Sequence, residues 1–382
     1  MDNGTIGILG GGQLARMMIL EGAPLGVRFR LLDTADSPCA SELAPTRRAD
    51  WRDETALAEL AGAVDVATFD FENVPAETAR WLTDRVRVHP GPQALAVAQD
   101  RMAEKTMFRE IGLDTAQFAV VDTRADLDAA LQSIGTPSIL KTRRLGYDGK
   151  GQYRLQGAGD ADAAWDALGD QAARHGLILE SFVPFDYEVS VIAARGRDGD
   201  FRTWPLTRNW HVDGILSLSL APAPAPAAIA AQAFAHARML AERLDYVGVF
   251  ALELFVHKDR VLGNEMAPRV HNSGHWTYDG AVTSQFQNHV RAVLGLPLGD
   301  TSARGLSVMF NWIGAMPDIT AALAVEDVHW HDYGKSARPG RKVGHATVCA
   351  PDANTLRDRV RALADALDRR DQVAPLLALE RI

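Results

Sequence analysis

The chain has 382 residues, of which 47% are hydrophobic and 23% are charged. These values are typical of a globular protein, and the length accommodates two or three domains. A formal net charge of −9 argues against a protein that binds nucleic acid or a membrane surface. The two cysteines, Cys39 and Cys349, lie far apart without metal-ligand spacing, so we expect unpaired thiols in a reducing compartment.

Hydropathy and the order of the predicted elements give the broad organisation. No apolar run reaches the ~18 residues of a membrane-spanning helix, and the first residues lack the basic stretch of a signal peptide. We therefore expect a cytoplasmic protein that does not enter a membrane. The predicted elements divide the chain into three domains, at residues 1–100, 101–296 and 297–382.

The first 100 residues predict a doubly wound, Rossmann-like α/β domain. The expected strands are 5–9, 27–32 and 64–69, with a helix at 14–21. The turn at 10–15 fits G-x-G-x-x-A, and Asp33 follows at the spacing of a dinucleotide-binding fingerprint. A glycine turn that only packs a helix onto the sheet has the same pattern. Residues 71–75 follow the third strand, at the sheet edge where such folds bind ligands.

The next segment carries groups suited to binding phosphates. We expect helices at 94–111 and 125–133 and strands at 116–121 and 138–141. The last strand ends in Lys141 and leads into a loop with three glycines between 146 and 151, whose N–H groups are able to contact phosphates. It is not a Walker A loop, because Gly151 follows Lys150 where Ser or Thr is required. Arg101 and Lys105 share a helix face, which also fits a solvated basic surface.

Further strands are expected at 177–180 and 188–192, followed by a segment at 204–211, an extended Ala-Pro connector at 221–227 and a helix at 228–244. Glu180 and Glu188 lie at strand ends, where solvated carboxylates are also common. His211 ends the third of these segments, and a structural histidine there is as plausible as a ligand-binding one.

A β-hairpin is expected from two apolar segments, 248–256 and 261–266. In a regular register Glu253 and Glu265 lie opposite each other on one face. At ~5 Å and an effective dielectric of ~20 they repel by roughly 3 kcal/mol. A fold tolerates this when one carboxylate is protonated, cations lie nearby or a metal bridges the pair. Such a pair suits Mg²⁺, and an edge hairpin with two solvated glutamates is the alternative.

The last part of the chain predicts a small, β-rich unit with one basic turn. Its expected strands are 306–312, 328–333 and 343–349, with a closing helix at 353–367, and a further helix is expected before it at 283–294. Between the second and third strands lie Lys335, Arg338, Arg341 and Lys342. Four cations in eight residues of an acidic chain favour anion binding, and a solvated turn is the alternative.

Five motifs carry a resemblance to a known family. They are GGGQL at 10–14, FENVP at 71–75, GYDGKGQ at 146–152, NEMAPRVHNSGH at 264–275 and RPGRKVGH at 338–345. In these motifs, and over nearly its whole length, the chain resembles the ATP-grasp superfamily and, more narrowly, the N5-carboxyaminoimidazole ribonucleotide synthases. The resemblance implies a multidomain α/β and α+β protein, with an ATP-grasp fold between a Rossmann-like (pre-ATP-grasp) domain and a small β-rich C-terminal domain.

The resemblance also implies a reaction. An ATP-grasp ligase of de novo purine biosynthesis would carboxylate 5-aminoimidazole ribonucleotide with ATP and bicarbonate, through carboxyphosphate, giving ADP and phosphate. Phosphorylation gives bicarbonate a good leaving group, so that catalysis consists mostly of positioning and of neutralising phosphate charge. Mg²⁺ is the implied cofactor. A homodimer is the implied assembly, with small molecules as partners and no nucleic acid or membrane.

Site residues follow by matching motif positions. The resemblance assigns ATP binding to Arg101, Lys141, Gly146, Tyr147, Asp148, Gly149, Lys150, Gly151, Gln152, Glu180, Ser181, Phe182, Val183, Glu188, His211, Asn264 and Glu265. It assigns acceptor binding to Gly12, Gln13, Leu14, Glu72, Arg269, His271, Lys335, Arg341 and Lys342. The implied catalytic residues are Arg269, His271, Tyr147 and Asp148, and the implied metal ligands are Glu253 and Glu265.

Three other functions share part of this pattern. A formate-dependent glycinamide ribonucleotide formyltransferase of the ATP-grasp superfamily would keep the metal pair, but the Tyr147-Asp148 pair favours the imidazole substrate. An NAD-linked Rossmann oxidoreductase would use the glycine turn and Asp33, but would leave the glutamate pair and the basic turn without a role. A non-catalytic nucleotide sensor would not need an intact metal site.

Overall fold

The computed structural model describes residues 3–144, 146 and 151–382, and its first sheet is parallel. The strands run in the order β3-β2-β1-β4-β5. They are β1 (Thr5–Leu9), β2 (Arg28–Asp33), β3 (Thr46–Arg48), β4 (Val66–Phe69) and β5 (Arg87–Val88), and the helices are α1 (Gln13–Gly22), α2 (Glu54–Ala61), α3 (Ala76–Thr83) and α4 (Pro92–Ala98), with the 3-10 turn η1 (Ala23–Leu25). Strands β1 and β4 are buried throughout, as in sheets covered by helices on both faces. The predicted doubly wound domain is confirmed.

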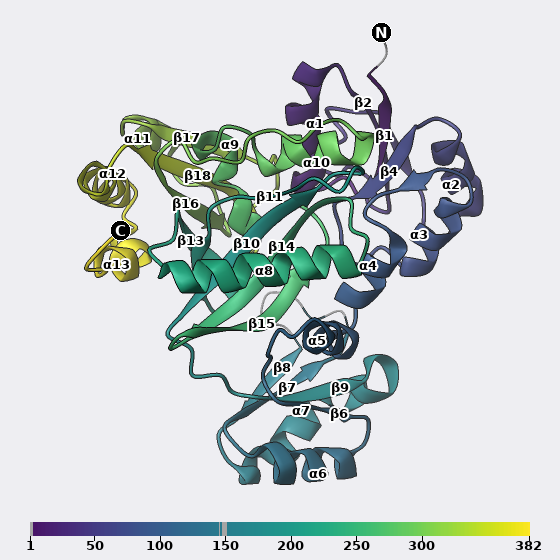
Figure 1. Ribbon diagram of the computed structural model, residues 1–382, viewed down its shortest axis with the longest axis vertical. Coiled ribbons are helices and arrows are strands. Elements are labelled where there is room, and N and C mark those ends of the chain that lie inside the picture. The colour runs from purple at the N-terminus through teal and green to yellow at the C-terminus, as the bar shows by residue number, and fades with distance from the viewer. Residues whose placement is uncertain (1–2, 145, 147–150) are drawn as a thin grey trace.

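The second sheet is antiparallel, in the order β6-β9-β7-β8. Its strands are β6 (Phe118–Val121), β7 (Ser138–Thr142), β8 (Gln152–Leu155) and β9 (Leu177–Ser181), and the helices of this region are α5 (Arg101–Glu110), α6 (Arg124–Ile134) and α7 (Ala161–His175), with η2 (Ala158–Asp160). Leucines of α6 and α7 pack with those of β7 and β9 in one core. Helix α5 lies between this sheet and β15 (Figure 1).

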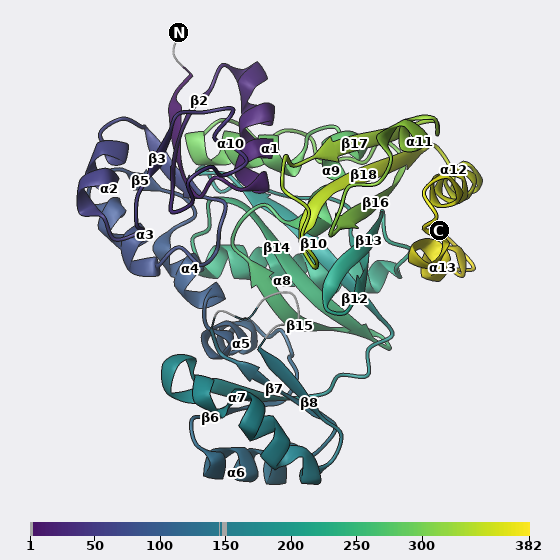
Figure 2. The same ribbon diagram turned by 180° about the vertical axis from the view of Figure 1, so that it is seen from behind.

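The third sheet has nine strands and forms the centre of the molecule (Figure 2). Its order is β15-β14-β10-β12-β13-β16-β18-β17, with β11 paired to β10. The strands are β10 (Tyr187–Arg195), β11 (Phe201–Thr203), β12 (Thr207–Val212), β13 (Ile215–Ala221), β14 (Gly248–His257), β15 (Arg260–Ala267), β16 (Leu306–Ile313), β17 (Val328–Asp332) and β18 (Lys342–Ala350). Because β13 pairs with β16, the strands after residue 296 continue the sheet of the preceding part.

Helices cover this sheet on both sides. They are α8 (Ala227–Arg243), α9 (Thr277–Gly280), α10 (Gln285–Leu294), α11 (Ile319–Leu323), α12 (Ala353–Ala366) and α13 (Arg370–Leu377), with η3 (Asn272–Gly274). Helix α8 crosses β10 and β14 on the face shown in Figure 1 and buries its alanine-rich side there. Helices α12 and α13 pack beside β16 and β18.

Two expected elements differ from the structure. The single helix predicted at 94–111 is wrong, because α4 ends at Ala98 and α5 begins at Arg101. Asp100 between them is extended, with φ −131°, and its carboxylate accepts the N–H groups of Met102 and Ala103, so it caps a new helix. The hairpin turn is also shorter than predicted. It contains two residues between β14 and β15, and the first of them, Lys258, has φ 58°.

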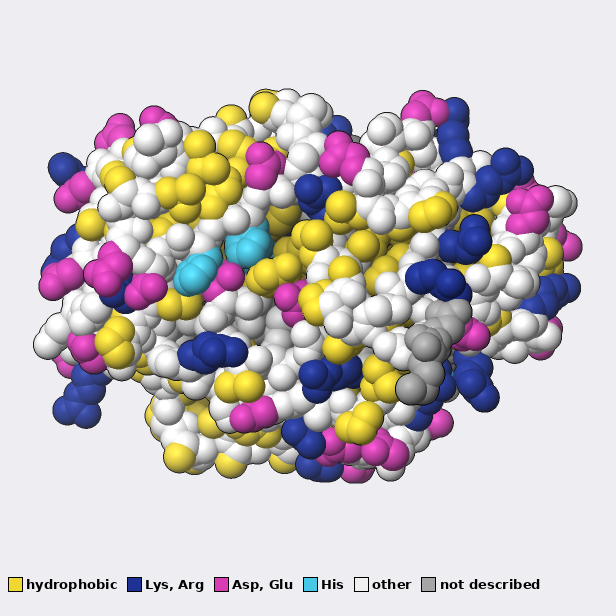
Figure 3. All heavy atoms as spheres, turned by 90° about the horizontal axis from the view of Figure 1, so that it is seen from above, with side chains coloured by type: hydrophobic (Ala, Val, Ile, Leu, Met, Phe, Trp, Pro, Cys, Tyr) yellow, Lys and Arg dark blue, Asp and Glu magenta, His cyan; other side chains and the backbone are white. Residues whose placement is uncertain are grey.

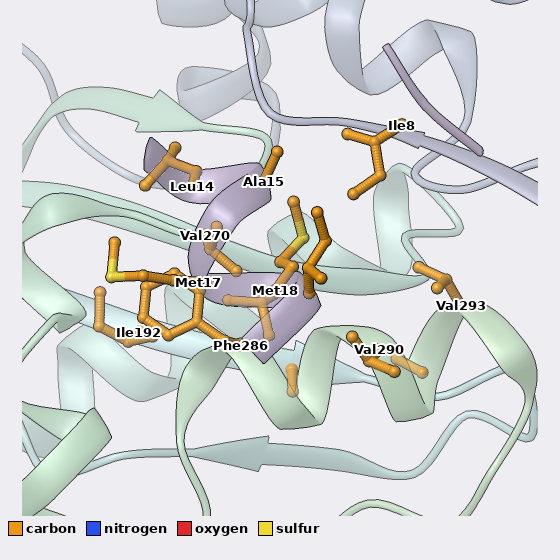
Figure 4. Close-up of a cluster of buried hydrophobic side chains, with 14 of the residues drawn as sticks. Ile8, Leu14, Ala15, Met17, Met18, Ile192, Val270, Phe286, Val290 and Val293 are labelled. Carbon is orange, nitrogen blue, oxygen red and sulfur yellow. The ribbon is translucent and has the colours of Figure 1, made fainter. Parts of the chain in front are cut away.

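The first sheet is joined to the third by the packing of α1 against α10 (Figure 4). Met17 and Met18 of α1 lie in one buried cluster with Phe286 and Val290 of α10 and with Ile192 of β10. Burial of such side chains contributes ~1.5–3 kcal/mol each. This core therefore fixes the glycine turn at the start of α1 relative to the central sheet.

The face seen from above in Figure 3 carries Lys and Arg side chains interspersed with Asp and Glu, with hydrophobic side chains between them. Within residues 3–144, 146 and 151–382, no helix combines the length and apolarity that crossing a membrane requires.

Truncation of Phe286, which is completely buried, tests the role of this core. We expect Phe286→Ala to lower the free energy of unfolding by ~3–5 kcal/mol, because a large cavity opens between α1 and α10. Urea denaturation of both proteins measures the change. Leu323→Ala is the control, since that side chain is 53% exposed and its loss should be nearly neutral. Equal effects of the two substitutions would contradict the prediction.

Candidate active site

One cleft of about 910 Å³ opens where the first sheet, α5, β15 and the turn before β18 meet. All nine residues predicted to bind the acceptor line it. They are Gly12, Gln13, Leu14, Glu72, Arg269, His271, Lys335, Arg341 and Lys342. Of the residues predicted to bind ATP, Arg101, Gly146 and Glu265 also line this cleft. The acceptor residues thus come from four segments of the chain, at 12–14, 72, 269–271 and 335–342, and face one space.

The glycine turn at the start of α1 is held by two aspartates of the chain itself. Asp33 Oδ2 accepts the N–H of Gly11 at 2.6 Å, and Asp70 Oδ2 accepts the N–H groups of Gly12 at 2.7 Å and of Ala15 at 3.2 Å. Gly10 has φ +105°, and a Cβ there would lie 1.7 Å from Asp70 Oδ1, so no other residue fits. Burial raises the pKa of Asp70 to about 6.

These contacts exclude the dinucleotide function. In a dinucleotide site the helix N-terminus binds the pyrophosphate and the acidic residue after the second strand binds the ribose. Here the Asp70 carboxylate accepts hydrogen bonds from N–H groups at the helix N-terminus, and the Asp33 carboxylate accepts one from the glycine turn. These are the groups that a dinucleotide would have to contact. The NAD-linked alternative is therefore wrong, although the strand order matches a Rossmann-like sheet.

The wall opposite the glycine turn is the basic turn between β17 and β18. Lys335 Nζ donates to the side-chain oxygen of Gln13, and burial lowers the pKa of Lys335. Arg341 Nη1 donates to Ser336 within the turn, at 2.9 Å. Arg269 Nη2 lies 2.7 Å from Glu72 Oε2, so this pair links the central sheet to the segment after β4.

Buried charges on α5, β7 and β9 form the base of the predicted nucleotide site. Lys141 Nζ lies 2.8 Å and Lys105 Nζ 3.4 Å from Glu180 Oε2. Burial favours the neutral acid, but the two lysines outweigh it and lower the pKa of Glu180 to about 2. Its second oxygen, Oε1, is buried without a hydrogen-bond partner among the described residues. This carboxylate therefore has one oxygen available to a ligand donor.

Two further groups lie beside these residues on α5: Lys105, which the sequence pattern placed on one face with Arg101, and Glu104, which it missed. Lys105, only 1% exposed, donates to the carbonyl of Asn264 at 3.3 Å. Glu104 accepts the N–H of Met266 at 2.6 Å, and burial followed by the charge of Glu265 raises its pKa to about 8. Arg101, Glu104 and Lys105 share a helix face by their spacing, which is the signal that marks all three.

The predicted register of the glutamate pair is confirmed, since Glu253 of β14 pairs directly with Glu265 of β15. A bulge follows Glu253. Burial, and next the charge of Glu265, raise the pKa of Glu253 from 4.5 to about 8. Arg101 Nη1 lies 3.4 Å from Glu265 Oε2, and His271 Nε2 lies 3.4 Å from Glu253 Oε1. Protonation of Glu253 and the positive charge of Arg101 beside Glu265 therefore both offset the repulsion.

This donor set fits Mg²⁺. The ion prefers one or two carboxylates and completes its octahedron with waters and phosphate oxygens, and the pair supplies two carboxylates.

Beyond the pair, His211 Nδ1 lies 2.8 Å from Glu188 Oε2. Burial opposes protonation of His211, but Glu188 outweighs it and raises the pKa of this imidazole.

Other residues predicted to bind ATP lie at the ends of strands or directly after them. Gln152 begins β8, Ser181 ends β9, and Phe182 and Val183 follow it. Gly151 has φ +68°. Four predicted residues, Tyr147, Asp148, Gly149 and Lys150, lie outside the described residues.

Comparison with known proteins follows the same three-part division. Residues 3–99 match the ribonucleotide synthetase preATP-grasp domain, residues 106–286 the ATP-grasp domain, and residues 307–359 the phosphoribosylaminoimidazole carboxylase C-terminal domain. This order defines an ATP-dependent, ligase-type enzyme of the ATP-grasp class.

The similar proteins narrow this class. The N5-carboxyaminoimidazole ribonucleotide synthase of Pseudomonas aeruginosa is 51% identical over 355 residues, which cover 93% of this chain and 97% of that protein. The crystal structure of N5-carboxyaminoimidazole ribonucleotide synthetase from Thermus thermophilus has a TM-score of 0.90 and 50% identity, covering 95% of this chain and 98% of that one. The chain belongs to the N5-carboxyaminoimidazole ribonucleotide synthase family.

A third relative carries ligands. The Aspergillus clavatus N5-carboxyaminoimidazole synthase, solved in complex with ADP and 5-aminoimidazole ribonucleotide, has a TM-score of 0.88 and 31% identity. The match covers 96% of this chain and 99% of that chain. The predicted family and the predicted ATP-grasp fold are both confirmed.

The raised pKa of Glu253 predicts a pH dependence of stability. Its value of about 8 in the folded protein lies above the ordinary 4.5, so the stability that this group contributes is present below about pH 4.5. That contribution is lost as the pH rises toward 8. Glu253→Gln lacks this loss. We expect the variant to gain stability relative to the metal-free wild type between about pH 5 and 8, measured by urea denaturation. Glu242→Gln is the control, and parallel profiles for Glu253→Gln and wild type would contradict the assignment.

Proposed function

We propose that this chain carboxylates 5-aminoimidazole ribonucleotide to the N5-carbamate at the expense of ATP and bicarbonate. One observation carries the proposal. A single cleft brings Arg269, His271 and the basic turn together with Glu265 and Arg101, so acceptor-binding cations face the groups that suit a metal-bound triphosphate. The names of the relatives support the same substrates, since the Aspergillus clavatus protein was solved with ADP and 5-aminoimidazole ribonucleotide.

On the nucleotide side, Lys141 and Arg101 would neutralise phosphate oxygens together with the glycine loop at 146–152. Glu180, Ser181, Phe182 and Val183 would bind adenine at the end of β9, and Glu188 would bind the ribose hydroxyls, with His211 close to the phosphates. Glu253 and Glu265 would hold Mg²⁺ with help from Asn264, and the ion would neutralise phosphate charge when bound. Loss of the proton on Glu253 would accompany metal binding.

On the acceptor side, Lys335, Arg341 and Lys342 would bind the monophosphate near Gln13. Arg269 and His271 would orient the imidazole and the bicarbonate-derived carboxyl group, with Tyr147 and Asp148 closing over them and Glu72 fixing Arg269. Transfer of the γ-phosphoryl group to bicarbonate gives carboxyphosphate, whose carbon is then attacked by the exocyclic amine with loss of phosphate. Burial of His271 and the neighbouring Arg269 lower the pKa of this imidazole, so it would contact the substrate as a neutral ring.

Four properties belong to the same proposal. They are a homodimer, a cytoplasmic location, Mg²⁺ as cofactor, and domain boundaries near residues 100 and 296. The boundary at 296 falls in a loop after α10 and before β16.

Substrate dependence of phosphate release tests the function. We expect phosphate release from ATP only with bicarbonate and 5-aminoimidazole ribonucleotide both present. Glycinamide ribonucleotide with formate replaces them in the parallel reaction that tests the formyltransferase alternative. Release with formate alone as the carbon source would overturn the proposal.

The metal assignment is tested by Glu265→Gln. We expect turnover to be lost while the fold is retained, because Mg²⁺ loses a charged ligand and the phosphates lose counter-charge. Removing the repulsion with Glu253 should also stabilise the metal-free protein slightly. Steady-state assays and urea denaturation measure the two effects, with Glu242→Gln on α8 as the control. Wild-type activity in Glu265→Gln would exclude this residue as a ligand.

The basic turn is tested by Lys335→Ala. We expect binding of 5-aminoimidazole ribonucleotide to weaken by ~1.5–3 kcal/mol, the range for a hydrogen bond to a charged group, while the affinity for ATP stays nearly constant. Isothermal titration with each ligand measures both affinities, and the exposed Arg361→Ala is the control for loss of a cation. An equal loss for both ligands, or a loss for ATP alone, would remove this turn from the acceptor site.

A further inference from the structure

Behind the cleft lies a cluster of buried histidines that no proposed step uses. His275 follows η3, His331 lies on β17 and His345 on β18. The rings of His331 and His345 stack at 4.3 Å with 10° between their planes, and the rings of His275 and His345 lie 5.0 Å apart. His331 Nε2 is 2.9 Å from Asp279 Oδ2. The cluster joins the segment after β15 to the two strands that flank the basic turn.

One end of the cluster is bonded to the acceptor residue His271 through Gln285. The N–H of His271 donates to Gln285 Oε1 at 2.9 Å, and Gln285 Nε2 donates to the carbonyl of His271 at 2.6 Å. Because a backbone N–H only donates, it fixes which end of the amide is oxygen. Gly274 permits the close approach, since a Cβ there would lie 2.7 Å from Gln285 Oε1. Gln285 thus holds both backbone polar groups of His271.

The same amide fixes the tautomer of His275. Gln285 Nε2 lies 3.1 Å from His275 Nδ1, and an amide NH₂ has no lone pair to offer, so Nδ1 accepts. Burial, and next the charge of His331, lower the pKa of His275 well below its ordinary value. A neutral ring that accepts at Nδ1 carries its proton at Nε2.

The other end is bonded to the basic turn. Tyr333 Oη lies 2.9 Å from His345 Nδ1. Two residues later in the chain, Lys335 places Nζ over the Tyr333 ring at 5.9 Å from its centroid and donates to Gln13. The hydrogen bond to His345 therefore holds Tyr333 in place, two residues before Lys335 in the acceptor cleft.

Between these two ends lies an unsatisfied pair. The Nε2 atoms of His275 and His345 are both buried without a partner among the described residues. The two side chains are 1% and 0% exposed. A buried donor without an acceptor is costly and is usually met by an ordered water. The N–H of His275 requires an acceptor, and a His345 that accepts the Tyr333 hydroxyl proton at Nδ1 carries its own proton at Nε2 and requires one as well.

We propose that Gln285, His275, His345 and Tyr333 form one buried relay, joined by hydrogen bonds and by the ring contact of the two histidines, that positions His271 and Lys335 in the acceptor cleft. The four are positioning residues, because each acts through a residue that faces the cleft. The consequence for binding rests on the proposed function. The relay itself is a statement about tautomers that is measurable without any substrate.

Tyr333→Phe removes one hydroxyl of the relay and keeps the ring. We expect KM for 5-aminoimidazole ribonucleotide to rise about 5–15-fold, the effect of one lost hydrogen bond, with KM for ATP unchanged. Thr347→Val is the matched control. It removes another buried hydroxyl without a partner from β18, two residues from His345, and both KM values should stay as in wild type.

A second measurement uses ¹⁵N-histidine spectra of the ligand-free protein. We expect His275 and His345 both as the Nε2–H tautomer, with the His345 signals changed in Tyr333→Phe, which removes the donor to Nδ1. A proton on Nδ1 of His275 would overturn the relay. Equal rises of both KM values, or no change in either, would overturn its effect on the acceptor while leaving the proposed function intact. Absence of acceptor-dependent phosphate release in the wild type would instead overturn the function, and the spectra would still decide the relay.

Discussion

The site depends on the repulsion between two glutamates held opposite each other across one hairpin. Backbone pairing of β14 with β15 fixes Glu253 against Glu265, so the carboxylates cannot separate without breaking the ladder. The structure offsets this cost from both sides, with a proton favoured on Glu253 and with Arg101 of α5 beside Glu265. Arg101, the cation beside this pair, therefore lies where it would neutralise a polyphosphate bound there. The contact of Arg101 with Glu265 also links α5 to β15.

Patterns of spacing predicted the elements whose signals are local. The hairpin register, the doubly wound first domain and the basic turn all follow from alternation and chain order. The break at Asp100 was missed because a capping carboxylate within a helical pattern looks like one more polar residue of a longer helix. The site residue Glu104 was missed, and Lys105 was assigned only to a helix face with Arg101, because the burial of both depends on β15, which is distant in sequence.

The glycine turn shows where a motif is insufficient. G-x-G-x-x-A and an aspartate after the second strand fit a dinucleotide site, and the sheet has the matching order. The decisive group is Asp70, whose position in the sequence carries no motif signal. Its carboxylate lies at the helix N-terminus where a pyrophosphate would bind. The same local sequence thus supports a different chemistry once one distant side chain is placed.

A cleft built from four segments that are distant in sequence requires those segments to be held in a fixed relation. Continuation of the central sheet through β13 and β16 fixes the basic turn, and the packing of α1 on α10 fixes the glycine turn. Both restraints lie in apolar cores and set position only coarsely. Direction at the level of single polar atoms requires hydrogen bonds, since packing alone leaves charged side-chain ends free to reorient. The buried contacts of Gln285 with His271 and of Tyr333 with His345 supply that direction at the two walls, and they do so away from solvent, where such bonds are strongest.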